Sequence, residues 1–164
     1  MPTHYDLHAH STASDGTLSP SELMRRAHAA GVEVMALTDH DTLEGLQEAG
    51  AAARKLGLEF VPGVEVSVTW LGITVHIVGL GVAPDSQVLD RGLARLREFR
   101  DWRAEEIGRR LAKHGIDGAF EGALGFSNGR LISRTHFARF LVQERHARDL
   151  RAVFRRFLVK NAVF

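Results

Sequence analysis

The chain has 164 residues with 45% hydrophobic and 25% charged side chains, which is typical of one soluble globular domain and excludes a disordered chain. The absence of cysteine excludes disulfide bonds, thiolate metal sites and a cysteine nucleophile. The net charge of +1 hides an asymmetry: residues 1–90 carry four Lys or Arg and twelve Asp or Glu (−8), whereas residues 91–164 carry 17 and eight (+9).

The sequence contains no apolar run long enough to span a membrane. Its first residues, Met1-Pro2-Thr3-His4-Tyr5-Asp6, lack the basic-then-apolar order of a signal peptide. We therefore expect a cytoplasmic protein with no membrane partner.

Short apolar runs predict four strands in the first half of the sequence. They cover residues 5–10, 34–38, 59–68 and 74–80. The third run contains Pro62-Gly63, which we expect to interrupt it, because proline cannot donate a hydrogen bond to a strand ladder. Leu71-Gly72 predicts a hairpin turn between the third and fourth strands.

Two helix starts separate these strands. Ser19-Pro20-Ser21-Glu22 combines an N-cap serine, a proline at the first helical position and a glutamate at the third, so a helix is predicted to about Ala30. The run Asp41-Thr42-Leu43-Glu44 repeats this pattern and predicts a second helix to Leu56, with Asp41 as its N-cap. Strands separated by capped helices indicate βαβ units in a parallel sheet or barrel.

The second half of the sequence is expected to be helical. Residues 87–113 predict one long helix or two abutting ones, with Gly115 as the stop, and residues 135–143 and 149–159 predict two short helices. The glycine-rich residues 118–130 between them are expected to form a loop. Eight of the nine Phe lie in this half, so we expect it to pack a small core of its own.

His8 and His10 begin the set of candidate metal ligands. In a strand, residues two apart project from the same face, so both imidazoles would point one way while Leu7 and Ala9 point the other. Two imidazoles held this close can start a chelate; the alternative is a pair of solvent-facing histidines near a strand end.

Further polar residues accompany the other predicted strands. They are Asp15, Asp39, His40, Asp41, Glu65 and His76. All but His76 fall at or beyond the C-terminal ends of the first three strands, where parallel α/β proteins place their active sites. Each also has a local explanation: a turn for Asp15, an N-cap for Asp41, an exposed strand position for Glu65 and a core position for His76. Because charged groups on apolar strands need a partner and this half has few cations, a metal site accounts better for the whole set.

The donor types suggest the chemistry of such a site. Imidazole and carboxylate together suit Zn²⁺, Mn²⁺ or Fe²⁺, and a carboxylate such as Glu65 can bridge two metals. Paired metals turn a water into hydroxide near neutral pH and clamp the oxygens of a phosphoryl transfer. The sequence contains no G-x-S-x-G motif and no P-loop that would point to another mechanism.

Four segments together resemble the motifs of the PHP (polymerase and histidinol phosphatase) superfamily. They are Asp6-Leu7-His8-Ala9-His10-Ser11, Ser14-Asp15-Gly16, Leu37-Thr38-Asp39-His40-Asp41-Thr42 and Pro62-Gly63-Val64-Glu65. Through residues 75–79 and 132–139 the chain is most similar to the nucleoside 3′,5′-bisphosphate phosphatase group, also described as RNase AM-like 5′→3′ exoribonucleases. The resemblance implies an α/β fold: the N-terminal portion of a distorted (βα)₇ barrel over residues 1–84 and a helical insertion over residues 85–164.

The resemblance also implies roles for individual residues in a site of up to three metals. His8, His10 and Glu65 match ligands of the first metal, Glu65 also matches a bridge to a second metal that His76 joins, and Asp15 and His40 match ligands of the third. Asp39 would then support a ligand or start a helix. Arg134 and His136 match a segment that contacts substrate phosphate. Mn²⁺ is the first expectation for the metal, with Zn²⁺ or Fe²⁺ as alternatives.

The family pattern continues beyond what this sequence offers. It adds a strand with a metal-binding histidine and a late Asp-x-His pair, and none of His114, His136 and His146 stands in such a context. Residues 159–164 also depart from the pattern. We therefore expect only the first half of the enzyme, with an incomplete ligand set and with apolar barrel edges open to self-association.

Arg134 differs from the other basic residues of the second half. A solvated helix face explains Arg145, Arg148 and Arg151, whereas Arg134 lies at a predicted helix start between Ser133 and Thr135. A guanidinium at a helix N-terminus suits a phosphate, and the basic surface around it would attract a short RNA.

The leading hypothesis is a metal-dependent phosphoesterase that hydrolyses nucleoside 3′,5′-bisphosphates or the 5′ ends of short RNA with a metal-bound hydroxide. A histidinol-phosphatase-like phosphomonoesterase is one alternative. An amidohydrolase, which also begins with His-x-His, fits Asp15 and residues 38–42 poorly. A truncated, catalytically inert metal-binding fragment or interaction module is the alternative from another class.

Overall fold

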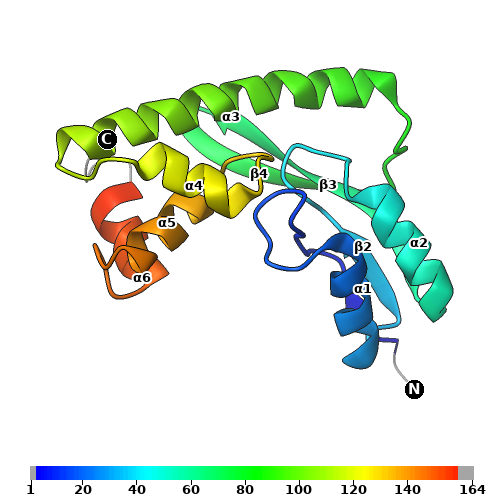
Figure 1. Ribbon diagram of the computed structural model, residues 1–164. Helices are drawn as coiled ribbons and strands as arrows, with labels where there is room; N and C mark the ends of the chain where they lie inside the picture. Colours follow the sequence, from blue (N-terminus) through cyan, green and yellow to red (C-terminus); the bar gives the residue numbers. More distant parts are fainter. Residues whose placement is uncertain (1–2, 159–164) are drawn as a thin grey trace. The chain divides into compact units, whose positions relative to one another are not determined.

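A computed structural model describes residues 3–158 (Figure 1). The chain divides into two compact units, Met1–Arg97 and Glu98–Phe164. The division falls within helix α3 (Gln87–Lys113), later in the chain than the boundary after residue 84 that the sequence suggests. No helix among the described residues has both the length and the apolar character needed to cross a membrane.

The first unit contains one four-stranded sheet in the order β1-β2-β3-β4. Its strands are β1 (Tyr5–Asp6), β2 (Val34–Leu37), β3 (Glu59–Trp70) and β4 (Ile73–Leu80). The first three are parallel and β4 is antiparallel to β3, so the sheet is mixed. The prediction of an α/β fold is confirmed.

Two strand predictions need correction. β1 ends at Asp6, so His8 and His10 lie in the segment after the strand and not within it. β3 runs without a break through Pro62, because this residue occupies the last pair with β2, at Leu37, just before pairing with β4 begins at Gly63. A Cβ on residue 63 would lie 2.8 Å from Thr38 Cγ2 and 3.0 Å from the Leu37 carbonyl oxygen, so this close approach of strands requires glycine.

The turn between β3 and β4 is the predicted hairpin. Leu71 and Gly72 both have positive φ, 48° and 75°, as a two-residue hairpin turn with the favoured twist requires. β4 is the outermost strand of the sheet, and most of its side chains are exposed, among them Ile73, Val75 and Ile77. Self-association through this edge stays a prediction.

Two helices pack with the sheet in the first unit. Helix α1 (Pro20–Ala29) begins with the predicted reciprocal cap between Ser19 and Glu22. Helix α2 (Leu46–Leu56) begins later than predicted, after Gly45, which makes no side-chain cap. The prediction that Asp41 is the N-cap is wrong, since this residue lies five positions before the helix in a left-handed conformation. The core between these elements includes Met24, Met35, Leu37, Ala49 and Ala53.

The second unit is helical. It contains the later part of α3, followed by α4 (Ala119–Ser127), α5 (Arg134–Gln143), α6 (Leu150–Val153) and a π-helical turn over Phe154–Leu158. The predicted loop over residues 118–130 is wrong, because α4 occupies most of it. Its Gly122 is a packing position: an added Cβ would lie 2.1 Å from Phe140 Cδ2. The prediction over residues 149–159 is confirmed up to Leu158, and Val159 lies outside the described residues.

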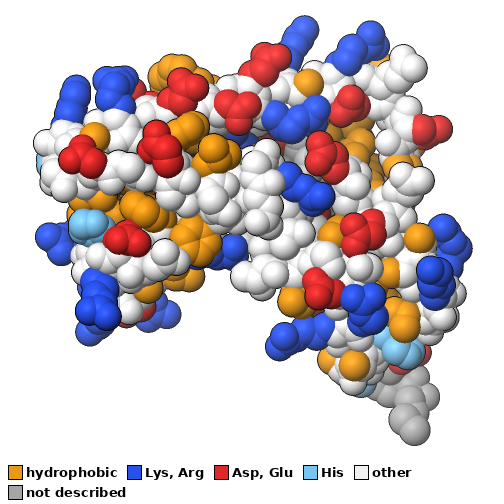
Figure 2. Space-filling model, viewed as in Figure 1, with side chains coloured by type: hydrophobic (Ala, Val, Ile, Leu, Met, Phe, Trp, Pro, Cys, Tyr) orange, Lys and Arg blue, Asp and Glu red, His pale blue; other side chains and the backbone are white. Residues whose placement is uncertain are grey.

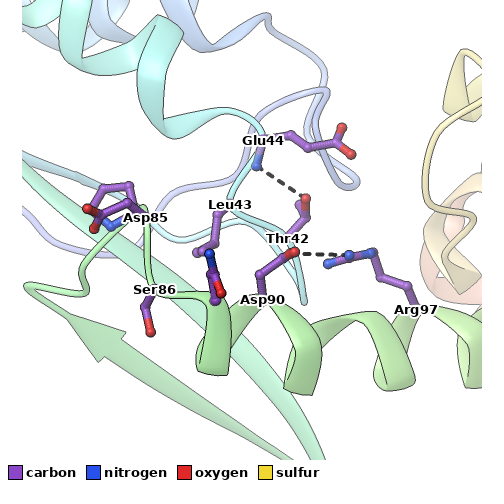
Figure 3. A pocket seen from close by; sticks show the side chains of 9 residues that line it. Thr42, Leu43, Glu44, Asp85, Ser86, Asp90 and Arg97 are labelled. Carbon is purple, nitrogen blue, oxygen red and sulfur yellow. Dashed lines mark hydrogen bonds and ion pairs between the residues drawn. The ribbon is translucent and has the colours of Figure 1, made fainter.

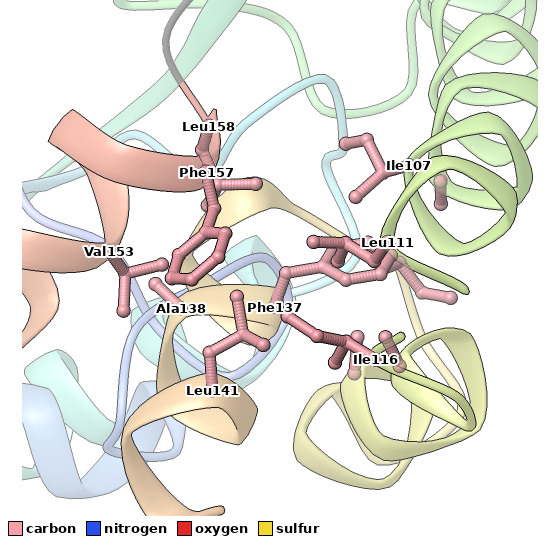
Figure 4. Packing of buried hydrophobic residues seen from close by; sticks show 13 residues of the cluster. Ile107, Leu111, Ile116, Phe137, Ala138, Leu141, Val153, Phe157 and Leu158 are labelled. Carbon is pink, nitrogen blue, oxygen red and sulfur yellow. The ribbon is translucent and has the colours of Figure 1, made fainter. Parts of the chain in front are cut away.

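The second unit has the separate core that its phenylalanines predict (Figure 4). Phe137, Leu111, Leu141 and Val153 are fully buried there, and Phe157 lies beside them. Basic and acidic side chains both occur along α3 on the face shown in Figure 2. The excess of positive charge in the second half of the chain is therefore interspersed with carboxylates on that face.

Candidate metal centre

Four histidines of the first unit surround the carboxylate of Glu65. Its Oε2 lies 2.6 Å from His8 Nε2 and 2.8 Å from His10 Nε2. The same oxygen lies 3.9 Å from His40 Nδ1, and Oε1 lies 3.4 Å from His76 Nδ1. Glu65 is therefore the shared neighbour of side chains that come from three separate segments.

His10 extends this arrangement to Asp15, because its second ring nitrogen, Nδ1, lies 3.2 Å from Asp15 Oδ1. The six predicted ligands form three overlapping groups, in each of which the candidate ligand atoms lie within 4.8 Å of one another. The groups are His8, His10 and Glu65; His10, Asp15 and His40; and His40, Glu65 and His76. The structure thus brings together all six side chains expected from the sequence.

Backbone hydrogen bonds place the histidine segment that follows β1. Ala9 accepts two hydrogen bonds at its carbonyl oxygen, from the Thr38 N–H at 2.9 Å and the Thr38 hydroxyl at 3.1 Å. Since Thr38 directly follows β2, these bonds hold His8 and His10 beside the end of that strand. His8 and His10 thus lie side by side as predicted. Contacts with Thr38 hold them there, beyond the end of β1, and the alternation of strand residues does not.

Glu65 lies inside β3 and not at its end, which corrects the placement expected from the sequence. β3 extends beyond β2, and an isolated parallel bridge joins its Glu65 to His40. The Glu65 N–H donates to the Asp39 carbonyl oxygen, and the Asp41 N–H donates to the Glu65 carbonyl oxygen, each at 3.1 Å. This bridge sets His40 and Glu65 side by side.

Burial and charge alter the acidity of two of these groups. Burial raises the pKa of Glu65, but the hydrogen bond with His8 and the nearby His40 and His10 outweigh it, so the pKa lies below its ordinary value. Burial lowers the pKa of His10, but the hydrogen bond and charge of Asp15, together with Glu65 and Asp39, raise it above its ordinary value. Both shifts favour the charged form and show how closely opposite charges are held here.

The Asp39 carboxylate accepts hydrogen bonds from both segments that carry His10 and Asp15. It accepts from the Ser11 N–H at 2.7 Å and from the hydroxyls of Ser11 and Ser14, both at 2.6 Å. Burial raises its pKa, and these hydrogen bonds act in the opposite direction. Because Ser11 follows His10 and Ser14 precedes Asp15, Asp39 holds both segments that carry candidate ligands. Asp39 does not start a helix, and its role as a support of metal ligands stays a prediction.

Sequence reasoning missed Ser11, Ser14 and Ser67 as supporting residues. Ser67 Oγ lies 3.2 Å from His76 Nδ1. Only the position of each serine near a candidate ligand could have drawn attention to it, because the partners are distant in sequence or on another strand.

The donor set fits divalent metal ions. Imidazole nitrogens and carboxylate oxygens are common ligands of Mn²⁺, Zn²⁺ and Fe²⁺. His8 Nε2 and His10 Nε2 are only 3.1 Å apart, and both point at one carboxylate that is almost fully buried. A cation between them would satisfy all three groups at once, which a hydrogen bond between two imidazoles cannot do.

The two predicted phosphate-binding residues lie in the second unit. Arg134 is the first residue of α5, as predicted; burial and the charge of Arg100 lower its pKa. His136 is almost fully buried, and its Nδ1 accepts a hydrogen bond from the Ser133 N–H at 3.2 Å as part of the helix cap.

Comparison with known proteins places these residues in a wider group. Residues 6–97 match the model of the PHP domain. The chain is 51% identical over 154 residues to a 3′,5′-nucleoside bisphosphate phosphatase of Chromobacterium violaceum, covering 93% of this chain and 54% of that protein. It is 41% identical to the 5′-3′ exoribonuclease Rnm of Escherichia coli, covering 96% and 54%. The chain thus spans about half the length of the curated relatives it matches.

Solved structures give the same picture. A Chromobacterium violaceum structure, described as an amidohydrolase with bound sulfate and no metal, superposes with a TM-score of 0.93 at 49% identity, over 97% of this chain and 56% of that one. A proposed metal-dependent phosphoesterase from Bifidobacterium adolescentis superposes with a TM-score of 0.89 at 25% identity, over 98% and 57%.

Proposed function

The chain belongs to the PHP domain family, and we propose from this membership that it is a metal-dependent phosphoesterase. The observation that carries the proposal is the convergence of six side chains, four imidazoles and two carboxylates, into three overlapping groups of ligand atoms. Ordinary ion pairing does not require four histidines around one buried carboxylate.

We propose nucleoside 3′,5′-bisphosphates or the 5′ ends of short RNA as substrates. Support comes from the names of two relatives, a 3′,5′-nucleoside bisphosphate phosphatase and a 5′-3′ exoribonuclease. Arg134 would bind a substrate phosphate through its guanidinium at the start of α5, and His136 of the same helix would contact that phosphate.

The proposed roles follow from the donor atoms. Bound divalent ions, Mn²⁺ first and Zn²⁺ or Fe²⁺ as alternatives, would polarise phosphate oxygens and make a water more acidic. Glu65, His8 and His10 would hold one ion, His76 would join Glu65 at a second, and Asp15 and His40 would hold a third. Asp39 keeps the His10 and Asp15 segments in place through Ser11 and Ser14.

The test combines metal analysis with an assay of the 164-residue chain. Purified protein is incubated with Mn²⁺ and, in separate reactions, with adenosine 3′,5′-bisphosphate, a 5′-phosphorylated RNA oligonucleotide or histidinol phosphate. Released inorganic phosphate is measured for the first and third substrates, and released mononucleotides are measured for the RNA. We expect release from the first two that depends on Mn²⁺ and is lost in His8→Ala, His40→Ala and Glu65→Ala. His28→Ala is the matched control, because His28 is an exposed histidine of α1 outside the three groups.

Other outcomes favour the alternatives. Release only from histidinol phosphate would favour a histidinol-phosphatase-like phosphomonoesterase. Metal binding without release from any substrate would favour an inert metal-binding module, which the chain's span of about half the relatives' length also suggests. Equal release by wild type and all three alanine variants would contradict the site assignment.

A further inference from the structure

We propose that Asp41 is a positioning residue that holds the His40 segment against β3, and that Arg97 of α3 holds Asp41 in place. We call the contacts of Asp41 and Arg97 the brace. The inference rests on the proposed metal binding but concerns how the ligands are held. Asp41 is not one of the six candidate ligands.

The backbone at Asp41 has an unusual conformation. Its φ is 51°, in the left-handed region, and the residue is fully buried. Side chains other than glycine enter this region at a cost, and Asp and Asn do so more readily than most. Since Asp41 directly follows His40, this turn sets the direction in which the chain leaves the ligand, and the surrounding contacts must hold it there.

Contacts with β3 hold this turn. The Asp41 carboxylate accepts a hydrogen bond from the Ser67 N–H at 2.7 Å, and the Asp41 N–H donates to the Glu65 carbonyl oxygen at 3.1 Å. Ser67 in turn lies 3.2 Å from His76 Nδ1 through its hydroxyl. Asp41 thus joins the His40 segment to the strand that carries Glu65, and Ser67 extends this link to His76, the third member of the same ligand group.

Arg97 completes the brace from α3. Its guanidinium donates to the Asp41 carbonyl oxygen at 3.1 Å. It also lies 3.3 Å from the Asp90 carboxylate (Figure 3). Arg97 and Asp90 both line a pocket of about 310 Å³ beside Thr42. Arg97, whose guanidinium also pairs with Asp90, thus links α3 to the turn after His40.

Three substitutions separate the two properties of Asp41. Asp41→Asn keeps an oxygen that can accept from Ser67 and keeps the tolerance for positive φ. Asp41→Gly keeps only the backbone freedom, and Asp41→Ala loses both. The Asn variant is therefore the conservative rescue, and the Gly variant removes the side-chain contact without adding backbone strain.

The experiment measures Mn²⁺ affinity of the 164-residue chain by isothermal titration, alongside thermal unfolding without metal. Mutation of residues that orient metal ligands typically lowers metal affinity 10- to 100-fold. We expect Asp41→Gly to bind Mn²⁺ at least about tenfold more weakly, with an unfolding midpoint near that of wild type, and Asp41→Asn to bind as wild type does.

Arg97→Gln is the second variant, in case Asp41→Gly does not fold. It should weaken Mn²⁺ binding less than Asp41→Gly does, and Arg95→Gln, an exposed arginine of the same helix, should not change it. The proposal is overturned if Asp41→Gly and Arg97→Gln both bind Mn²⁺ with wild-type affinity, or if affinity falls only in proportion to lost folded protein.

A metal-free readout separates this proposal from the proposed function. The ring-nitrogen NMR signals of His40 and His76 should shift in Asp41→Gly and return in Asp41→Asn, whether or not the chain hydrolyses any substrate. Unchanged signals in Asp41→Gly would overturn the brace. Failure of the phosphatase assay with shifted signals would contradict only the proposed function.

Discussion

Glu65 carries more of the candidate centre than any other residue. It belongs to two of the three ligand groups and lies beside four histidines, whereas Asp15 belongs to one group. Its side chain is only 7% exposed, so few waters can replace a missing ligand. The two carboxylates should therefore contribute unequally to metal binding.

Substituting each carboxylate by its amide tests this inequality. Glu65→Gln should lower Mn²⁺ affinity by at least about tenfold and reduce the number of ions bound, because an amide oxygen lacks the charge that two groups share. Asp15→Asn should reduce the number of bound ions less than Glu65→Gln does. Isothermal titration gives both quantities, and a smaller loss in Glu65→Gln than in Asp15→Asn would contradict the shared role.

The sequence predicts the clustering of the candidate ligands better than the contacts that hold them. The clustering could be predicted because candidate metal ligands belong to few residue types and because their motifs resemble a family. The clustered residues are His8, His10, Asp15, His40, Glu65 and His76. The local sequence pattern predicts that Asp41 is an N-cap, whereas its carboxylate accepts a hydrogen bond from the N–H of Ser67, 26 positions away. Such supporting contacts depend on tertiary structure, and local spacing does not encode them.

Among the elements, the helix α4 shows how glycine content can mislead. Two of its glycines differ in surroundings: a Cβ on Gly122 would overlap the Phe140 ring, whereas a Cβ on Gly125 would meet nothing within 4 Å. Glycine usually indicates a turn, but at Gly122 it permits close packing of α4 with α5. The α1 cap, the β3–β4 hairpin and the approximate positions of the strands could be predicted because their signals are local, whereas the end of β1 and the continuity of β3 could not.

Alanine at each position tests this difference. Gly122→Ala should lower the free energy of unfolding by about 1–3 kcal/mol, because the methyl group overpacks against Phe140. Gly125→Ala should be neutral or raise it by up to about 1 kcal/mol, since alanine favours a helix. Chemical denaturation measures both, and equal effects would show that the packing contact is not limiting.

The cap of helix α1 gives a prediction for pH. The side chain and backbone N–H of Ser19 hydrogen-bond Glu22 and hold the pKa of its carboxyl below its ordinary value. A lowered pKa in the folded state means that this contribution to stability is fully present above the unfolded pKa and is lost as pH falls through the folded pKa. An NMR titration should show the low pKa, and Ser19→Ala should raise it; an unchanged pKa in Ser19→Ala would rule out the cap as its cause.

On the scale of the whole molecule, the charge asymmetry of the sequence matches a division of chemistry. The acidic first half holds the cluster of carboxylates and histidines, and the basic second half holds a helical unit with its own core. The two compact units divide inside α3, within a long helix whose sequence gives no local sign of a boundary. The expected boundary after residue 84, between barrel portion and helical insertion, stays a prediction.

Metal binding should stabilise the folded chain. A ligand that binds only the folded state at a free concentration of 100 times its Kd adds about 2.7 kcal/mol. We therefore expect Mn²⁺ to raise the thermal midpoint, excess EDTA to reverse the rise, and Glu65→Gln to reduce it. An equal rise in wild type and Glu65→Gln would place the stabilising ions outside the candidate centre.

Anomalous diffraction from Mn²⁺-soaked crystals of the chain shows directly whether the cluster around Glu65 binds divalent metal. We expect the strongest anomalous peaks within bonding distance of the Glu65 carboxylate and the imidazoles of His8, His10, His40 and His76. Anomalous peaks confined to other parts of the molecule, with this cluster empty at saturating Mn²⁺, would contradict this expectation.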